Sequence, residues 1–177
     1  MAPRHDIRSY QFENDRKYFL DTNILLAVYG PFPPEEHRAK IYSGPLKRLR
    51  AAGVPAFFDV LVASEFVNVW ARYEFKIQDF GGDFKAFRAS PEFQRVAKDI
   101  AQALRSILTF VRPSPTPFAN IDLLAKVDEF ETARFDFNDL MVEECCRSRS
   151  YILVTDDGDF GDADVSIVTG NRELLGK

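Results

Sequence analysis

Short apolar runs alternate along this chain with longer amphipathic stretches. We interpret four of the runs as buried strands: residues 17–22 (KYFLDT), 54–61 (VPAFFDVL), 151–155 (YILVT) and 165–170 (VSIVTG). Their apolar character is largely continuous, which is typical of parallel strands that are covered on both faces. The runs therefore predict a sheet whose strands are enclosed by other elements.

The stretches between these runs predict helices. Residues 62–77 carry apolar side chains at spacings of three and four, and residues 91–111 form a longer stripe of the same kind. Further helices are predicted from about Asn23 to near Gly30, across 34–53 with an interruption at Gly44–Pro45, across 120–133, and from near Asp136. Strands that alternate with helices predict a layered α/β fold with a mainly parallel sheet.

Length and composition favour one globular domain. The chain has 177 residues, 46% of them hydrophobic, and a net charge of −4. An acidic total argues against a protein that coats nucleic acid in bulk, but it leaves room for a local basic groove. The adjacent Cys145 and Cys146 are too few for a disulfide framework, and His5 and His37 lack the spacing of zinc ligands.

The first residues form a separate polar segment. We place an N-terminal arm at residues 1–16, either loose or added to an edge of the sheet, and a single domain at residues 17–177. The arm lacks the apolar core of a signal peptide, and the apolar runs elsewhere are too short to span a membrane. We expect a soluble, cytoplasmic protein without a membrane partner.

Carboxylates recur beside the predicted strands. Asp21 directly follows the first strand, and Glu65 lies about one helical turn beyond the second. Asp139 takes the third position of a helix that Asp136 would cap, and the strand at 151–155 leads into Asp156, Asp157 and Asp159. Each acid alone has a simple local explanation, since Asp is common at helix N-caps and in turns, and a Glu on a polar helix face is usually solvated.

Together the acids indicate a shared site. Ligands bind beyond the carboxyl ends of parallel strands, where these side chains should meet. Neighbouring carboxylates repel each other, and a divalent cation relieves that repulsion. A ligand set made of oxygen, without a useful His or Cys, favours Mg²⁺ or Mn²⁺. The favoured chemistry is metal-assisted hydrolysis of a phosphodiester bond.

Four motifs resemble those of the PIN domain family, and in particular its VapC-like members, the ribonuclease toxins of type II toxin–antitoxin pairs. They are FLDTNILL, ASEFVNVW, FNDLMVEECC and ILVTDDGDF, in that order, and the resemblance extends from about Lys17 to the end of the chain. It implies a three-layer α/β/α sandwich with a central, mainly parallel sheet. Two features depart from the smallest members of the family, namely the arm before Tyr18 and the long segment 76–117.

The resemblance also implies roles for individual residues. Its four catalytic acids match Asp21, Glu65, Asp139 and Asp157, and Asp159 matches a frequent additional acid. Asp21, Asp139, Asp157 and Asp159 would be the metal ligands, supported by Thr22, Asn23 and Thr155. The implied activity is endoribonuclease cleavage of RNA dependent on Mg²⁺ or Mn²⁺. An antitoxin protein and a second copy of the chain are the implied partners.

Basic residues on two predicted helices are candidates for holding RNA. Lys98 and Arg105 lie seven residues apart on one helix, and Arg72 and Lys76 lie on the helix that carries Glu65. Such contacts with phosphates position a strand without reading its sequence. A simply solvated polar face explains the same pattern.

Other functions fit the sequence less well. A phosphatase of the haloacid type needs a second Asp two residues after the first, where this chain has Asn23. A nucleotide-binding oxidoreductase needs a glycine-rich turn after the first strand, and DTNILL has none. Two alternatives stay open: a non-catalytic protein-binding module of the same fold, and a metal-dependent DNA nuclease.

Overall fold

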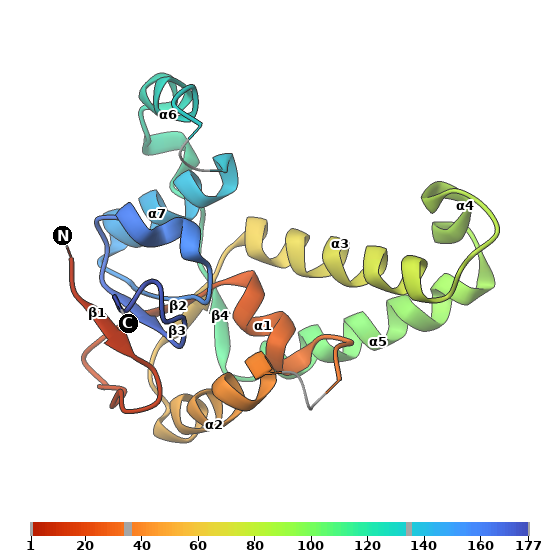
Figure 1. Ribbon diagram of the computed structural model, residues 1–177, viewed down its shortest axis with the longest axis horizontal. Coiled ribbons are helices and arrows are strands. Elements are labelled where there is room, and N and C mark those ends of the chain that lie inside the picture. Colours follow the sequence, from red (N-terminus) through yellow and green to blue (C-terminus); the bar gives the residue numbers. More distant parts are fainter. Residues whose placement is uncertain (1, 34–36, 134–135, 177) are drawn as a thin grey trace.

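A central sheet of six parallel strands organises the molecule (Figure 1). The computed structural model describes residues 2–33, 37–133 and 136–176. The strands are β1 (Arg4–Asp6), β2 (Tyr18–Leu20), β3 (Ala56–Phe58), β4 (Val111–Pro113), β5 (Ile152–Val154) and β6 (Ile167–Thr169). Their order in the sheet is β1-β6-β5-β2-β3-β4, and every neighbouring pair is parallel.

Helices cover both faces of this sheet. They are α1 (Thr22–Tyr29), α2 (His37–Ala52), α3 (Val60–Ile77), α4 (Phe84–Arg88), α5 (Pro91–Ile107), α6 (Leu123–Phe130) and α7 (Phe137–Arg149). In Figure 1, α7 lies on one side of the sheet and α1 and α2 lie on the other, whereas α3 and α5 extend away from it with α4 at their far end. The three-layer α/β/α fold predicted from the sequence is confirmed.

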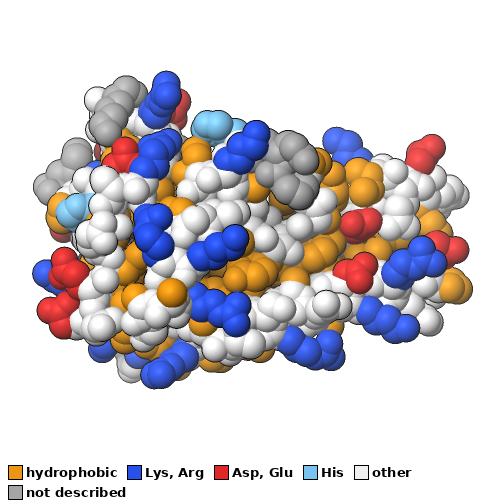
Figure 2. Space-filling view, turned by 90° about the horizontal axis from the view of Figure 1, so that it is seen from below, with side chains coloured by type: hydrophobic (Ala, Val, Ile, Leu, Met, Phe, Trp, Pro, Cys, Tyr) orange, Lys and Arg blue, Asp and Glu red, His pale blue; other side chains and the backbone are white. Residues whose placement is uncertain are grey.

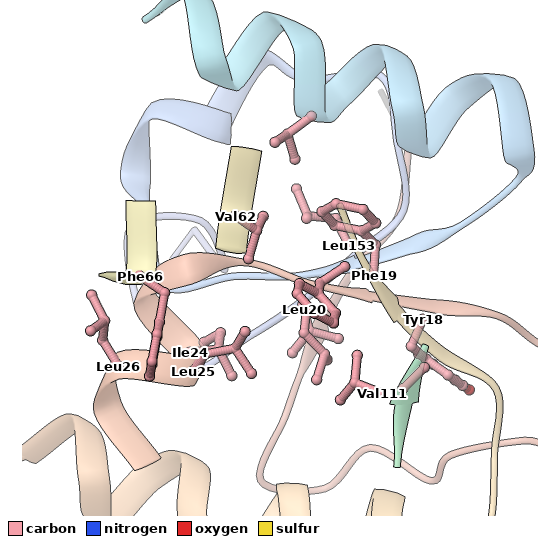
Figure 3. Packing of buried hydrophobic residues seen from close by; sticks show 14 of the residues in the cluster. Tyr18, Phe19, Leu20, Ile24, Leu25, Leu26, Val62, Phe66, Val111 and Leu153 are labelled. Carbon is pink, nitrogen blue, oxygen red and sulfur yellow. The ribbon is translucent and has the colours of Figure 1, made fainter. Parts of the chain in front are cut away.

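The core forms where β2 passes between the two helical layers. Tyr18, Phe19 and Leu20 are fully buried. In Figure 3, Phe19 lies beside Leu153 of β5 on the α7 side, and Leu20 lies with Ile24 of α1 on the opposite side. A strand enclosed in this way needs apolar residues at every position, which explains the continuous apolar run in the sequence.

At two places on the same edge of the sheet, an Asp follows a strand and caps the helix that comes next. Asp21 ends the segment of β2 and caps α1, and Asp59 ends the segment of β3 and caps α3. Asp136 caps α7, as the sequence predicts. Each side chain accepts a hydrogen bond from a backbone N–H of the first helical turn, a group that the helix itself leaves without a partner.

Two helix predictions need correction. α2 runs from His37 to Ala52 without the interruption predicted at Gly44–Pro45, because the Pro45 ring is buried along the face by which α2 packs on the core. Residues 34–36 of that predicted helix lie outside the described residues. The helix predicted at 91–111 ends at Ile107, and Val111 begins strand β4.

The four strands predicted from the sequence do not include the two edge strands, β1 and β4. β4 contains Pro113, which is tolerated because β4 is an edge strand. β1 lies in the N-terminal arm and pairs with β6, so the arm does add an edge to the sheet. In the parts of the chain that the structure describes, no helix has the length and apolar content needed to span a membrane.

Candidate active site

The carboxyl ends of β2 and β5 enclose the natural ligand position of this fold. The chain runs from β2 to β3 and β4 on one side, then returns to β5 and β6 on the other side of β2. Crossovers that leave in opposite directions open a crevice between the two strands at this point. Asp21 directly follows β2, and Thr155, Asp156 and Asp157 directly follow β5.

Asp21 is fixed by three neighbours. Its Oδ1 accepts a hydrogen bond from the backbone N–H of Thr22 (2.7 Å), and its Oδ2 accepts from Asn23 Nδ2 (2.8 Å) and Thr155 Oγ1 (2.6 Å). The residue is only 7% exposed. These contacts hold the carboxylate in one orientation, and they place Thr22, Asn23 and Thr155 where the resemblance assigned supporting roles.

The loop after β5 is tied to the same point. Thr155 Oγ1 accepts from the backbone N–H of Asp157 (3.0 Å), and Asn23 Oδ1 accepts from the backbone N–H of Asp156 (3.1 Å). Asp157 then caps the 3₁₀ turn η2 (Gly158–Asp162), where its Oδ1 accepts from the backbone N–H of Asp159 (3.1 Å). Asp157 therefore lies close enough to Asp21 for their charges to interact, and Asp159 follows it in the same turn.

The other two predicted acids come from the helices. Glu65, in the second turn of α3, accepts a hydrogen bond at Oε2 from Thr22 Oγ1 (2.8 Å). Asp139 lies in the first turn of α7, and its carboxylate is close enough to Asp21, Asp157 and Asp159 to feel their charges. Asp21, Glu65, Asp139, Asp157 and Asp159 thus gather in one region, which we call the acidic cluster.

The electrostatics of the cluster show how crowded it is. The pKa of Asp21 is raised to about 6, chiefly by burial and also by the charges of Glu65 and Asp157, against the lowering effect of the Thr155 and Thr22 hydrogen bonds. Burial also raises the pKa of Asp139 to about 7, with added repulsion from Asp21 and Asp157. Both groups resist carrying a negative charge near neutral pH.

The described residues provide no cationic side chain that offsets the repulsion between these carboxylates. Among residues 2–33, 37–133 and 136–176, no Lys, Arg or His forms an ion pair with any acid of the cluster. Asp156, immediately beside Asp157, differs because it pairs with Arg38 Nε (2.8 Å) and accepts a hydrogen bond from the Tyr42 hydroxyl. Within the described part of the chain, the cluster is therefore a concentration of negative charge without a cationic partner.

A hard divalent cation fits the chemistry of these donors. All are carboxylate oxygens, and three of the lone-pair positions on Asp21 are already used by hydrogen bonds, which leaves one for an ion. As the side chains stand, no three of the described His, Cys, Asp or Glu residues form a closed ligand set. Without an ion, the carboxylates repel one another and stay further apart than ligands of a bound ion. The chemistry of the donors therefore fits a divalent cation, although the side chains do not form a closed ligand set.

Several residues near the cluster were not predicted or act elsewhere. Arg38 and Tyr42 contact Asp156 from the first two turns of α2. The partners are more than a hundred positions apart, and no local sequence pattern signals such a contact. Glu143, one turn beyond Asp139, instead accepts a hydrogen bond from the backbone N–H of Asp164 (2.8 Å).

The basic residues predicted to hold RNA lie along the extended helices. Arg72 and Lys76 are exposed on α3, and Lys98 and Arg105 are exposed on α5. The Arg72 guanidinium lies over the Phe84 ring, 4.8 Å from its centroid. Their role in RNA binding stays a prediction.

Comparison with known proteins identifies the fold. No protein-family model and no curated protein sequence matches the chain. Among solved structures, it is similar to VapBC2 from Rickettsia felis bound to a DNA fragment from its promoter, with a TM-score of 0.55 and 16% identity over 86% of this chain and 97% of that one. It is also similar to PAE2754 from Pyrobaculum aerophilum, with a TM-score of 0.54 and 13% identity over 91% of this chain and 94% of that one. The chain therefore has the VapC-like PIN-domain fold that its four motifs predicted.

Proposed function

We propose that this protein is an endoribonuclease that depends on Mg²⁺ or Mn²⁺ and hydrolyses phosphodiester bonds of RNA. The observation that carries the proposal is the acidic cluster at the crevice between β2 and β5, which contains the buried Asp21 and the half-buried Asp139, both of raised pKa, and no cationic partner among the described residues. A site built only to stabilise the fold would avoid this arrangement, because uncompensated buried charge is destabilising.

The residues of the cluster divide the work. Asp21 and Asp157 would hold the ion directly, and Asp139 would hold it directly or through a water. Such an ion polarises a phosphoryl oxygen and makes water acidic enough to attack at neutral pH. Glu65, oriented by the Thr22 hydroxyl, would direct the attacking water, while Asn23 and Thr155 keep the Asp21 carboxylate in place.

The proposal includes two protein partners. The similarity in fold to VapBC2 supports a role as the toxin of a toxin–antitoxin pair, with an antitoxin protein as inhibitor. The apolar side chains exposed on α6, with Leu124 72% and Phe130 46% exposed, support a second copy of the chain as a further partner.

Cleavage assays with labelled RNA and DNA test the activity. We expect the wild type to cleave RNA with Mg²⁺ or Mn²⁺, to be inactive in EDTA, and to leave DNA intact. Asp21→Asn should reduce cleavage by at least about a hundredfold, because it removes a charged ligand of the ion. Asp99→Asn makes the same chemical change on the exposed surface of α5 and should leave the rate unchanged.

Melting curves give a second measurement that does not depend on activity. Saturating Mg²⁺ should raise the Tm of the wild type by a few degrees, since the ion binds only the folded protein. Asp21→Asn should lose that increase and Asp99→Asn should keep it. Cleavage that persists in EDTA, or an active Asp21→Asn variant, contradicts the mechanism. A folded, metal-binding protein that cleaves DNA instead of RNA contradicts the substrate.

A further inference from the structure

A hollow of about 340 Å³ lies beside the acidic cluster. Arg8 and Arg172 line it from the segments after β1 and β6, and Arg38 lines it from the first turn of α2. Asp156, the residue before Asp157, belongs to the same lining. Since β6 and β1 follow β5 in the sheet, the hollow and the cluster are neighbours along one edge.

The charges of this hollow are unequally satisfied. Arg38 is paired with Asp156, and Arg8 divides its guanidinium between Asp6 Oδ1 (3.0 Å) and the carbonyl of Gly170 (2.9 Å). Arg172 is exposed, and its side chain makes no hydrogen bond or ion pair with any residue that the structure describes. Glu173 is the other acid of the lining. One guanidinium of the hollow thus has no partner among the described residues and can bind an anion from outside.

Positive charge continues from the hollow onto α2. Its segment His37–Ala52 contains no Asp or Glu, and it exposes Arg38, Lys40, Lys47, Arg48 and Arg50. Figure 2 shows Lys and Arg side chains gathered over the face seen from below, which is the side of α2 in Figure 1. Arg48 Nη2 also donates to the carbonyl of Ile7 (3.2 Å), so the basic surface of α2 reaches the end of β1.

Positive charge at this place matters for RNA binding, because the net charge of the whole protein is negative. The net charge is −4, and the acidic cluster adds a local concentration of negative charge at the place where the phosphate to be cut would bind. A polyanion is drawn to such a site only if positive charge lies close beside it. The guanidinium group suits this purpose, since its fixed fork of N–H donors matches two oxygens of one phosphate.

We infer that Arg8, Arg38 and Arg172 form a subsite for a backbone phosphate of the RNA strand, adjacent to the phosphate that is cut. Neighbouring strands lie about 4.8 Å apart, so the ends of β6 and β1 are one and two strand positions from Asp157. The RNA would enter along α2, with Arg172 contacting one phosphate while the acidic cluster receives the next. This inference deepens the proposed function and rests on RNA as its substrate.

RNA binding measured without cleavage tests the subsite. Fluorescence anisotropy of a labelled single-stranded oligoribonucleotide in EDTA, repeated over a series of NaCl concentrations, gives both the affinity and its salt dependence. Arg172→Ala should weaken binding roughly three- to tenfold. The slope of log K against log[NaCl] should become shallower by about 0.7, as expected for one lost phosphate contact on a single strand. The combined Arg8→Ala and Arg172→Ala variant should lose about twice as much slope.

Lys85→Ala is the matched control. Lys85 is exposed on α4 at the far end of the extended helices, so its replacement removes one positive charge away from the hollow. It should retain the affinity and slope of the wild type. Circular dichroism melting should show that Arg172→Ala and Lys85→Ala are as stable as the wild type, because the Arg172 side chain has no partner to lose among the described residues, and it should measure what the double variant loses with the contacts of Arg8 to Asp6 and Gly170.

Three results would overturn the inference. They are an Arg172→Ala variant indistinguishable from Lys85→Ala, a wild type that binds no RNA at low salt, and a site that binds inorganic phosphate through Arg172 without any change in the RNA slope. The proposed activity fails separately. A wild type that shows the expected loss of slope but never cleaves RNA with metal would retain the phosphate subsite and refute the nuclease.

Discussion

Asp21 shows how one side chain joins structure to chemistry. It ends a buried strand, caps α1 through the backbone N–H of Thr22, and faces the crevice together with Thr155. The cap uses only one of the two lone pairs of Oδ1, and Oδ2 accepts from Asn23 and Thr155, so one position on Oδ1 is left for an ion. The local role of Asp21 as a cap and its proposed role as a metal ligand are therefore compatible.

The raised pKa values predict a pH-dependent stability of the metal-free protein. Burial and repulsion raise the pKa of Asp21 to about 6 and that of Asp139 to about 7, so the folded state binds protons more tightly than the unfolded chain. The free energy of unfolding should therefore fall as pH rises from about 4 to about 7, and Asp21 accounts for at most about 3 kcal/mol of this fall. Urea unfolding in EDTA across this range measures it.

Asp139→Asn should flatten that dependence, because a neutral amide neither titrates nor repels Asp21. Asp99→Asn, an exposed position on α5, should leave the pH profile as it is in the wild type. A metal-free protein whose stability is constant or rises between about pH 4 and about pH 7 would show that the carboxylates are not crowded as described.

At the scale of elements, the sequence predicts best what is local. The passages from β2 through Asp21 into α1, and from β5 into Asp157, combine an apolar run with a neighbouring acid, and both are visible within a few residues. β4 was not predicted because a short edge strand with Pro113 looks like a break. The continuous α2 was not predicted because core packing outweighs the cost of Pro45, roughly 3 kcal/mol in an isolated helix interior.

Contacts between distant segments were beyond prediction, and Tyr42 is the clearest case. From α2, its hydroxyl donates to Asp156 after β5 and accepts from the backbone N–H of Gly170 after β6 (2.8 Å). The three residues come from separate parts of the chain, so no periodicity or motif signals their meeting. Tyr42 is fully buried, and it fastens α2 to the sheet edge that carries the site.

Tyr42→Phe tests this fastening. The variant keeps the ring but leaves the Gly170 N–H and one oxygen of Asp156 without their partner, so we expect a loss of about 1–3 kcal/mol in the free energy of unfolding. Tyr73→Phe is the control, since Tyr73 contacts Phe32 through its ring. Chemical denaturation of both variants measures the difference. Equal stabilities would mean that the hydroxyl of Tyr42 contributes nothing to the anchoring of α2.

At the scale of the molecule, the apolar side chains fall into two groups. The Phe-rich segment at the tip of α3, α4 and α5 is satisfied within the chain, because Phe87 is fully buried among the rings of Phe75, Phe80 and Phe93. The rings of that segment pack against one another. Among the described residues, exposed large apolar side chains occur at several places, and four of them lie together on α6: Leu123, Leu124, Val127 and Phe130.

α6 contacts α7 through one charged and one aromatic side chain, Lys126 and Phe130. Lys126 pairs with Glu129 (2.8 Å) and approaches Glu144 of α7 (3.7 Å). The Phe130 ring packs edge-on against the Phe137 ring of α7, with 5.9 Å between the ring centroids, whereas Leu124 is 72% and Val127 is 40% exposed. An amphipathic helix normally buries its apolar side, so we expect another protein surface to cover the exposed apolar side chains of α6.

We expect a second copy of the chain to provide that surface, since a self-complementary apolar patch is the simplest route to a closed dimer. Light scattering of the wild type should therefore give the mass of a dimer at micromolar concentration, and Leu124→Asp should shift it to a monomer without lowering its melting temperature, because Leu124 contributes little to the core. Lys85→Asp, on the exposed surface of α4, should remain dimeric. A monomeric wild type would instead leave α6 as a surface for the antitoxin, and an unaffected Leu124→Asp dimer would place the contact between the copies elsewhere.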